Sequence, residues 1–347
     1  MRLLITGGCG FIGSNFIHML LQEDPTAFIC NVDKLTYAGN PANLAGVQES
    51  YPGRYVFAKA DIADETAMHR IFQDYGIDAV VNFAAESHVD RSIADPSPFI
   101  HTNVRGAQVL LSVAHELGIK RYVHVSTDEV YGSLSLDEPD TAFTEQTPLA
   151  PNSPYSASKA AADLFCRAWY ETYDFPVVIT RCSNNYGPYQ FPEKLIPLMY
   201  SKAVKSEPLP VYGDGKNVRD WIHVLDHCRG VYLALTKGRP GAVYNFGGGA
   251  ERNNLEVVRA ILRFCDKSDA LISFVKDRPG HDKRYAMNYD LAVRELGFSP
   301  RYTFEAGLEA TLRWYGDNSP WMDGVTSGAY LTFMRDWYGD RVSTTPT

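Results

Sequence analysis

The stretch MRLLITGGCGFIG, residues 1–13, decides the fold of this chain. Its apolar residues 3–6 run directly into a glycine-rich turn, and a helical pattern begins after the turn. The glycines satisfy both the G-x-G-x-x-G and the G-x-x-G-x-x-G spacings. Between a strand and a helix, such glycines allow the backbone to approach a pyrophosphate at the start of the helix. We therefore predict a dinucleotide-binding turn formed by Gly7, Gly10, Phe11, Ile12 and Gly13.

A carboxylate at the end of the next apolar run, residues 28–33, supports this prediction. Asp33 lies 20 residues after Gly13, where such a side chain accepts hydrogen bonds from the adenosine ribose. This favours NAD over its 2′-phosphorylated relative, although the neighbouring Lys34 weakens the preference. Asp61 and Ile62 follow a third run and could face the adenine ring, but a solvated loop aspartate is an equally ordinary interpretation.

Apolar runs continue to alternate with helical patterns through the first half of the chain. Runs typical of buried strands occur at residues 55–58, 79–83, 122–126 and 177–180. Residues 67–75 and 104–117 have helical periodicity instead. This alternation predicts an α/β fold, a Rossmann-like doubly wound parallel sheet with helices on both faces.

The pattern changes after Cys182, where stretches rich in Pro and Tyr follow with less regular spacing. We predict an NAD-binding domain over residues 1–182. Residues 219–250 are expected to return to it, since 224–235 looks helical and 243–246 looks like a strand. Residues 183–218 and 251–340 are then a smaller α/β lobe that binds the substrate, and 341–347 a frayed tail.

Composition narrows the classes of function. The chain has 347 residues, 45% of them hydrophobic, and a net charge of −8. An acidic balance argues against nucleic-acid and membrane-surface partners. The six cysteines are scattered, with no C-x-x-C, so neither a zinc site nor a disulfide framework is indicated and a reducing cytoplasm is the expected location. No apolar run approaches the roughly 18 residues of a membrane span, and the start does not resemble a signal peptide.

Tyr155 and Lys159 form a Tyr-x-x-x-Lys pair, one helical turn apart, so both side chains lie on one helix face. A tyrosine is a poor base until a cation lowers its pKa, and the Lys159 ammonium is placed to do so. Ser126 and Thr127 are available to hydrogen-bond a substrate hydroxyl. A surface tyrosine and lysine are the ordinary alternative, but the glycine turn upstream favours a redox pair.

The sequence STDEVYG, residues 126–132, places Asp128 and Glu129 side by side after a buried run. Two such carboxyl groups can act as acid and base, which an elimination needs and a plain dehydrogenase does not. They must then lie where the strand gives way to a loop, and Asp128 must hold a proton that Glu129 lacks. A solvated Asp-Glu loop is the alternative.

These features together resemble the extended short-chain dehydrogenase/reductase superfamily and, within it, the dTDP-glucose 4,6-dehydratases. The resemblance extends from Met1 to about Trp321. Cys9 stands where many relatives carry Ala. The passages that carry the likeness are DKLTYAGN (33–40), AAESHVDRS (84–92), STDEVYG (126–132), RCSNNYGPY (181–189), NVRDW (217–221) and DRPGHD (277–282).

The resemblance implies a mechanism with a role for each residue. Tyr155 takes the proton of the glucose 4-hydroxyl while hydride passes from carbon 4 to NAD, and Thr127 polarises the 4-oxygen. The resulting ketone acidifies carbon 5, where Glu129 is the base. Asp128 is the acid that protonates the departing 6-hydroxyl, and hydride then returns to carbon 6. The cofactor ends as it began and is expected to stay bound.

The resemblance also implies two sets of binding residues. Further cofactor contacts are expected from Lys34, Leu35, Thr36, Ala84, Ala85, Glu86, Ser87, Thr102 and Asn185. The nucleotide sugar, dTDP-glucose in the family, is expected to contact Ser87, Thr127, Asn184, Lys194, Leu195, Pro210, Val211, Tyr212, Arg219, Asn254, Arg278 and His281. The two arginines suit a pyrophosphate because a guanidinium offers forked donors and keeps its charge. Either could equally be part of a surface salt bridge.

Local sequence patterns bear on a possible metal site and on a possible oligomer. His223, Asp226 and His227 have helical spacing that imitates metal ligands, but no third histidine or cysteine lies nearby, so no metal is expected. The helical stretches 104–117 and 157–173 carry small and apolar residues on more than one face. One such face could form a homodimer, as in the family, or pack on its own sheet.

Two other functions stay open at the level of sequence. A nucleotide-sugar 4-epimerase or decarboxylase shares the glycine turn and the Tyr-Lys pair but needs no elimination acid, so Asp128 and Glu129 discriminate against it. A non-enzymatic NAD-binding module would be expected to lose catalytic residues, whereas all five candidates are present: Thr127, Asp128, Glu129, Tyr155 and Lys159.

Overall fold

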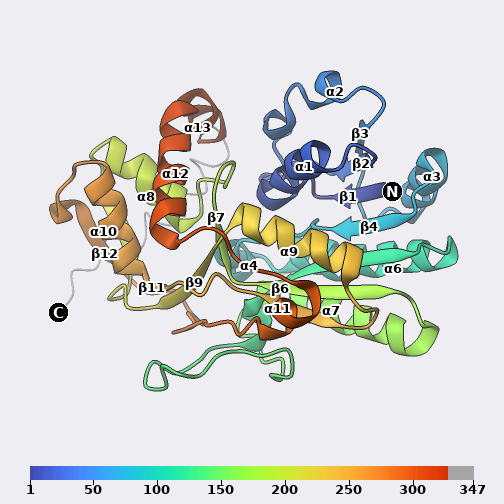
Figure 1. The fold of residues 1–347 in the computed structure, drawn as a ribbon. Helices are drawn as coiled ribbons and strands as arrows, with labels where there is room; N and C mark the ends of the chain where they lie inside the picture. Colours follow the sequence, from blue (N-terminus) through green and yellow to red (C-terminus); the bar gives the residue numbers. More distant parts are fainter. Residues whose placement is uncertain (327–347) are drawn as a thin grey trace.

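The computed structural model describes residues 1–326, and a parallel sheet of seven strands forms its centre (Figure 1). The strand order is β10-β6-β5-β4-β1-β2-β3, and every neighbouring pair is parallel. The predicted doubly wound α/β fold is therefore confirmed. The strands are β1 (Arg2–Thr6), β2 (Phe28–Asp33), β3 (Tyr55–Lys59), β4 (Ala79–Asn82), β5 (Arg121–Thr127), β6 (Val177–Cys182) and β10 (Val243–Phe246).

Helices cover both faces of this sheet because its strands are apolar on both sides. Leu3 and Ile5 of β1 pack in one core with α1 (Phe11–Glu23), α9 (Val224–Lys237) and α11 (Asp290–Leu296). Leu4, between them in sequence, packs in a second core on the opposite face. The helices of that face are α3 (Glu65–Tyr75), α6 (Ala107–Glu116) and α7 (Pro154–Tyr173).

One predicted helix begins in an unusual way. The pattern at residues 104–117 starts inside a π-helical segment, η2 (Ile100–Gly106), which follows the short helices α4 (Val89–Ala94) and α5 (Ser97–Phe99). Asn103 of η2 is buried, and its amide bonds both the N–H and the C=O of Glu86, at 2.9 Å each, and the Ser158 hydroxyl at 2.8 Å. The wide turn thus ties the loop after β4 to helix α7.

A smaller lobe lies beside the sheet in Figure 1, with its own apolar core. A three-stranded sheet in the order β11-β9-β7 and a pair of parallel strands, β8 and β12, belong to it. Its strands are β7 (Asn184–Tyr186), β8 (Leu209–Tyr212), β9 (Val218–His223), β11 (Glu251–Asn253) and β12 (Ile272–Val275). Its helices are α8 (Leu195–Val204), α10 (Asn254–Phe264), α12 (Phe304–Asp317) and α13 (Ser319–Val325).

The chain passes between the large sheet and the lobe more than once. Within residues 219–250, β9 pairs with the small sheet, whereas α9 packs on the large sheet and β10 pairs with β6. The end of the predicted lobe, 327–340, and the predicted tail, 341–347, lie outside the described residues. Among residues 1–326, no helix is long and apolar enough to cross a membrane.

Candidate active site

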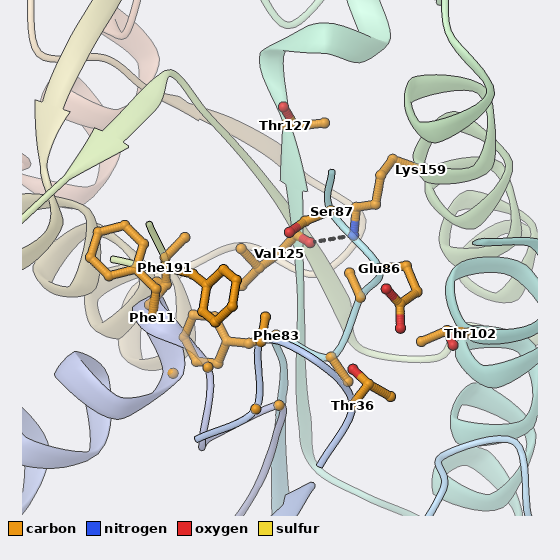
Figure 2. Close-up of a pocket in the computed structure, with 18 of the residues that line it drawn as sticks. Phe11, Thr36, Phe83, Glu86, Ser87, Thr102, Val125, Thr127, Lys159 and Phe191 are labelled. Carbon is orange, nitrogen blue, oxygen red and sulfur yellow. Dashed lines mark hydrogen bonds between the residues drawn. The ribbon is translucent and has the colours of Figure 1, made fainter. Parts of the chain in front are cut away.

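A cleft opens at the carboxyl ends of β1, β2, β4, β5 and β6, where sheets of this kind bind ligands. Figure 2 shows side chains from distant segments, such as Phe11, Thr36 and Thr102, gathered around it. Every residue predicted to contact the cofactor lines this cleft except Leu35. The predicted reactive residues Thr127, Asp128, Glu129, Tyr155 and Lys159 line it too.

The glycine turn forms one wall of the cleft. Gly7 has a φ of +68°, and a Cβ at this position would lie 2.7 Å from the backbone of Ala84, so a side chain here is excluded on two grounds. Gly10 precedes helix α1 without a side-chain cap. The first backbone N–H groups of α1 therefore remain available for an anionic group, as a pyrophosphate requires.

Asp33 is buried at the end of β2 and is held by two backbone donors. Cys9 N–H donates to its Oδ2 at 2.9 Å and Leu35 N–H to its Oδ1 at 2.8 Å. Burial raises the pKa of Asp33, while these two hydrogen bonds oppose the rise. Leu35 therefore acts through the carboxylate of Asp33 rather than as part of the cleft wall.

Asp61 is not the solvated loop aspartate that the sequence left possible. Lys34 Nζ lies 2.7 Å from its Oδ2, and His101 Nε2 lies 2.9 Å from the same oxygen. Burial opposes ionisation, but the hydrogen bond from Lys34 and the other donors outweigh it and lower the pKa of Asp61 to about 2. Lys34 is thus engaged by Asp61, and His101 is a neighbour that sequence reasoning missed.

Tyr155 and Lys159 project from the first turns of α7, a helix that begins with a capping box between Ser153 and Ser156. Both side chains are buried, at 8% and 3% exposure. Lys159 Nζ donates to the Val125 carbonyl at 2.7 Å (Figure 2). Burial lowers the pKa of Lys159, and the Asp163 carboxylate opposes that change.

Lys159 was expected to lower the pKa of Tyr155, but the net effect of the surrounding protein is in the opposite direction. The pKa of Tyr155 lies well above its ordinary value, chiefly because of burial and then because of the Glu129 carboxylate; the hydroxyl of Thr127 acts in the opposite direction. The physical reason is that the Lys159 ammonium is directed at Val125. Activation of the tyrosine therefore needs positive charge in addition to that of Lys159.

Asp128 and Glu129 lie where β5 ends, in the short 3₁₀ turn η3 (Asp128–Tyr131) that Thr127 caps. Asp128 is buried, and the Thr127 hydroxyl donates to its Oδ1 at 3.2 Å. Burial, and next the charge of Glu129, raise the pKa of Asp128 well above its ordinary value. The field at this site therefore favours a protonated Asp128.

Glu129 is half-buried and lies in a different field. Burial also raises its pKa, but three cations oppose the rise: Arg278, Lys194 and Arg219. Lys194 Nζ donates to the Ser87 carbonyl at 2.7 Å, and Arg219 donates to the Asp282 carbonyl at 3.0 Å. The two neighbouring carboxyl groups thus differ in the direction that an acid and a base require.

The structure brings part of the predicted nucleotide-binding set together. The Tyr212 hydroxyl donates to Asp90 Oδ2 at 2.9 Å, and Arg278 lies 3.5 Å from Asp90 Oδ1. The ring of His281 lies edge-on to that of Tyr212, with centroids 6.1 Å apart. Asp90, buried on α4, links the large domain to the lobe and was missed as a site residue.

Other predicted nucleotide contacts are placed less directly. Of the set, Ser87, Thr127, Asn184 and Lys194 line the cleft. Pro210 and Val211 lie in β8, with Val211 in the core of the lobe, while Leu195 and Asn254 begin helices α8 and α10.

The residues with metal-like spacing have separate protein partners. His223 caps α9 through the N–H of Leu225, Asp226 accepts the N–H groups of Arg301 and Tyr302, and His227 bonds Asn185 at 3.0 Å. They do not converge on one point. The last contact also positions Asn185, a predicted cofactor residue.

Several polar atoms around the cleft are suited to a bound dinucleotide and sugar. Among the described residues, five buried atoms of the lining make no hydrogen bond within the protein: Ser126 Oγ, Asp128 Oδ2, Ser183 Oγ, Asn184 Oδ1 and Gln190 Oε1. Buried polar groups are normally paired, so these atoms are expected to gain partners from ligands or water. Gln190, with Phe83, Phe191 and Glu193, also lines the cleft without having been predicted.

Comparisons with known proteins agree with this geometry. The family model described as GDP-mannose 4,6 dehydratase matches residues 4–311. A curated relative, dTDP-glucose 4,6-dehydratase of Xanthomonas campestris pv. campestris, is 49% identical over 94% of this chain and 96% of its own. The crystal structure of DesIV, a dTDP-glucose 4,6-dehydratase from Streptomyces venezuelae with NAD bound, is 49% identical, has a TM-score of 0.89 and is aligned over 94% of this chain and 100% of its own. UDP-glucose 4-epimerase of Thermus thermophilus is more distant, at 28% identity over 92% of this chain and 100% of its own with a TM-score of 0.84.

Proposed function

The chain belongs to the family of the dTDP-glucose 4,6-dehydratases, NAD-dependent hydro-lyases, and from this membership we propose how its own residues convert dTDP-glucose to dTDP-4-keto-6-deoxyglucose and water. The observation that carries the proposal is the difference between Asp128 and Glu129. Adjacent in sequence and at the same cleft, one carboxyl is buried beside a negative charge and the other faces cations.

NAD is the cofactor, and the cleft fits it: the glycine turn leaves room for a pyrophosphate and Asp33 lies where the adenosine ribose is expected. When bound, NAD accepts hydride from carbon 4 of the glucose and returns it to carbon 6. We assign the binding of NAD to the predicted residues that line the cleft. Leu35 contributes indirectly, because its N–H donates to the Asp33 carboxylate.

Tyr155 is proposed to accept the proton of the 4-hydroxyl. It lies next to Thr127, whose hydroxyl can donate to the 4-oxygen as that oxygen becomes a carbonyl. Burial keeps Tyr155 protonated in the free protein, so this step depends on positive charge that arrives with oxidised NAD and on the Lys159 ammonium. General base catalysis of this kind typically contributes about 10²- to 10⁴-fold.

Glu129 and Asp128 are proposed to perform the elimination. Once carbon 4 is a ketone, the hydrogen on carbon 5 is acidic enough for a carboxylate, and the cations around Glu129 keep it available as that base. Asp128, which burial keeps protonated, gives its proton to the 6-hydroxyl as it leaves. The unpaired Oδ2 of Asp128 is the atom available for that contact.

The nucleotide diphosphate is proposed to bind between the two parts of the protein. Arg219 and Arg278 supply forked donors to the phosphates, and Tyr212 and His281 flank the same region. Asn184, Lys194, Leu195, Pro210, Val211 and Asn254 complete the proposed set. The predicted division into an NAD-binding part (1–182 with 219–250) and a substrate-binding lobe (183–218 with 251 onward) is proposed on the same basis, except that β9 belongs to the lobe and α11 packs on the large sheet.

A homodimer and a cytoplasmic location are also proposed. Large apolar side chains are exposed on the helices predicted to pair, notably Ile100 at 58% in η2, Leu164 at 57% and Tyr173 at 51% in α7. All six cysteines are free, as expected in a reducing compartment. Light scattering of the purified protein tests the first proposal, and a mass of one chain would exclude it.

The activity is tested by incubating the purified protein with dTDP-glucose and with UDP-glucose. We expect the dTDP sugar to lose the mass of one water with no net formation of NADH, at a higher kcat/KM than the UDP sugar. A product of unchanged mass would instead indicate an epimerase, the activity of the more distant structural relative.

A further inference from the structure

A row of buried polar side chains crosses the central sheet beneath the cleft. Thr6 of β1, Asn82 of β4 and His124 of β5 are register partners on adjacent strands, with at most 1% exposure each. Parallel sheets that are covered on both faces usually carry apolar residues here, because buried polar groups cost free energy unless they are paired. The row therefore requires an explanation beyond packing.

The hydrogen bonds along this row have a direction. The N–H of Ala84 donates to Thr6 Oγ1 at 3.3 Å, so the proton of the Thr6 hydroxyl is given to Asn82 Oδ1, at 2.6 Å. The amide nitrogen of Asn82 then donates to His124 Nδ1, at 3.2 Å. Since Nδ1 accepts, the single proton of the neutral imidazole is on Nε2.

His124 Nε2 lies between two charged groups of α7. Lys159 Nζ is 3.5 Å from it on one side and Asp163 Oδ1 is 3.8 Å from it on the other. Burial, and then the charges of Lys159 and Arg181, lower the pKa of His124 and keep it neutral. The Asp163 carboxylate is too far for a hydrogen bond, but its charge favours a proton on Nε2. An Nε2–H cannot accept from the ammonium, so Lys159 directs its protons to Val125 and the cleft.

Asp163 exerts the strongest charge interaction on Lys159. It is 1% exposed, and its other oxygen accepts from Arg181 Nε at 2.8 Å. Arg181 is held in turn by the Tyr131 hydroxyl at 2.9 Å, which donates to Asn245. The remaining ionisable groups around Lys159 are the thiols of Cys166 and Cys182 and the Tyr155 phenol. Asp163 thus supplies the main attraction that offsets the burial of the lysine ammonium.

We propose that His124 and Asp163 are positioning residues for the oxidation step: Asp163 keeps the buried Lys159 charged, and His124, fixed by the row from Thr6, sets where the ammonium points. The helix motif that matters is then Tyr155, Lys159 and Asp163, at successive intervals of four residues on one face of α7. This inference rests on the proposed role of Tyr155 and Lys159. Neither His124 nor Asp163 touches the cleft.

The first test is the rate of NAD reduction by dTDP-glucose, followed by rapid mixing as a function of pH. The Asp163→Asn substitution removes a negative charge and so lowers the pKa of Lys159. The decline of the rate at alkaline pH is then expected about one pH unit lower than in the native protein, and the maximum rate about tenfold lower. Asp163→Glu keeps the charge and restores the native profile. KM for the sugar nucleotide is unchanged in both variants, since neither residue lies in the cleft.

A matched control separates this effect from simple destabilisation. Asp226→Asn removes another buried carboxylate, one that holds the backbone of Arg301 and Tyr302, and it is expected to keep the native pH profile. The proposal is overturned if the alkaline decline of the NAD-reduction rate is not shifted in Asp163→Asn, or if it is shifted equally in Asp226→Asn. If the native protein itself fails to reduce NAD with dTDP-glucose, the proposed function fails instead.

The second test does not depend on activity or on the folding of a variant. In the NAD-bound native protein labelled with ¹⁵N-histidine, the nitrogen spectrum of His124 reports which ring nitrogen carries the proton. We expect the Nε2–H form across neutral pH, with no sign of protonation at Nδ1. The Nδ1–H form would overturn the direction of the row and with it the positioning of Lys159.

Discussion

The two proposed proton-transfer pairs, Asp128 with Glu129 and Tyr155 with Lys159, line the same cleft but differ in their electrostatic surroundings. Burial raises the pKa of both proposed proton carriers, Asp128 and Tyr155. At Glu129 three cationic side chains oppose this effect, whereas at Asp128 the charge of Arg219 is set against those of Glu129 and Asp220. At the tyrosine, the Lys159 ammonium donates to the Val125 carbonyl instead.

This difference shows that the residue type does not assign the role. Two carboxylic acids one peptide bond apart are proposed to act as acid and base because carboxylates dominate the charges around Asp128 and cations those around Glu129. We therefore infer that the carboxylate pair is arranged in advance, whereas the tyrosine needs the charge of the cofactor as well as that of Lys159. Variants that alter each environment separately can test this distinction.

The largest effect is expected from Glu129→Gln. Without the base, the hydrogen on carbon 5 is not removed, so release of water should fall by about 10²- to 10⁴-fold. Oxidation at carbon 4 does not need Glu129, and its removal also takes a negative charge away from Tyr155, so partial reduction of bound NAD should persist. Product mass and the absorbance of reduced nicotinamide measure the two steps separately.

Glu145→Gln is the matched control for this variant. Glu145 is also a partly buried glutamate with a raised pKa, but it accepts from the N–H of Asn245 at 3.0 Å and does not line the cleft. Dehydration should be nearly native in this protein. Full dehydration by Glu129→Gln would refute the role of base and remove the distinction between the two pairs.

A smaller effect, about 10²-fold on water release, is expected from Asp128→Asn because an amide keeps the shape of the acid without its proton. The pH dependence carries more information. Asp128 acts in its protonated form, so native dehydration should decline as pH rises through its raised pKa. That decline should vanish in Asp128→Asn; a native alkaline profile in the variant would show that another group supplies the proton.

The sequence was sufficient for the sheet and the cofactor side of the cleft because those residues lie next to strand ends that the apolar pattern marks. Gly7, Asp33 and Asp128 are examples. The sequence could not show that Asp90 contacts Arg278 and Tyr212, or that Asp163 lies close to Lys159 on the side away from the cleft. Those contacts depend on how distant segments pack, and a buried carboxylate looks like a surface one in a sequence.

Arg278→Gln should have a moderate effect through two separate causes. Loss of a charged hydrogen-bond donor to the diphosphate should raise KM for dTDP-glucose by about tenfold. Loss of the first of the three cations also raises the pKa of Glu129, so the acid side of the dehydration profile should move to higher pH. Arg259→Gln, which removes an exposed partner of Asp269, is the control and should change neither quantity.

The smallest effect on activity, and the sharpest separation of the two pairs, is expected from Asp220→Asn. Burial raises the pKa of Asp220 from 3.8 to about 6, and its charge raises that of Asp128. Replacing it should therefore move the alkaline decline of dehydration to lower pH and leave the pH profile of NAD reduction nearly unchanged, because burial and Glu129 are the main influences on the pKa of Tyr155. Stability gives an independent measure. The folded protein binds the Asp220 proton more tightly than the unfolded chain, so this residue's contribution is fully present below about pH 4 and is lost as pH rises through about 6, a change of about 3 kcal/mol. Urea unfolding at several pH values should show that the free energy of unfolding varies less with pH for Asp220→Asn than for the native protein. The same dependence on pH in both proteins would contradict the raised pKa.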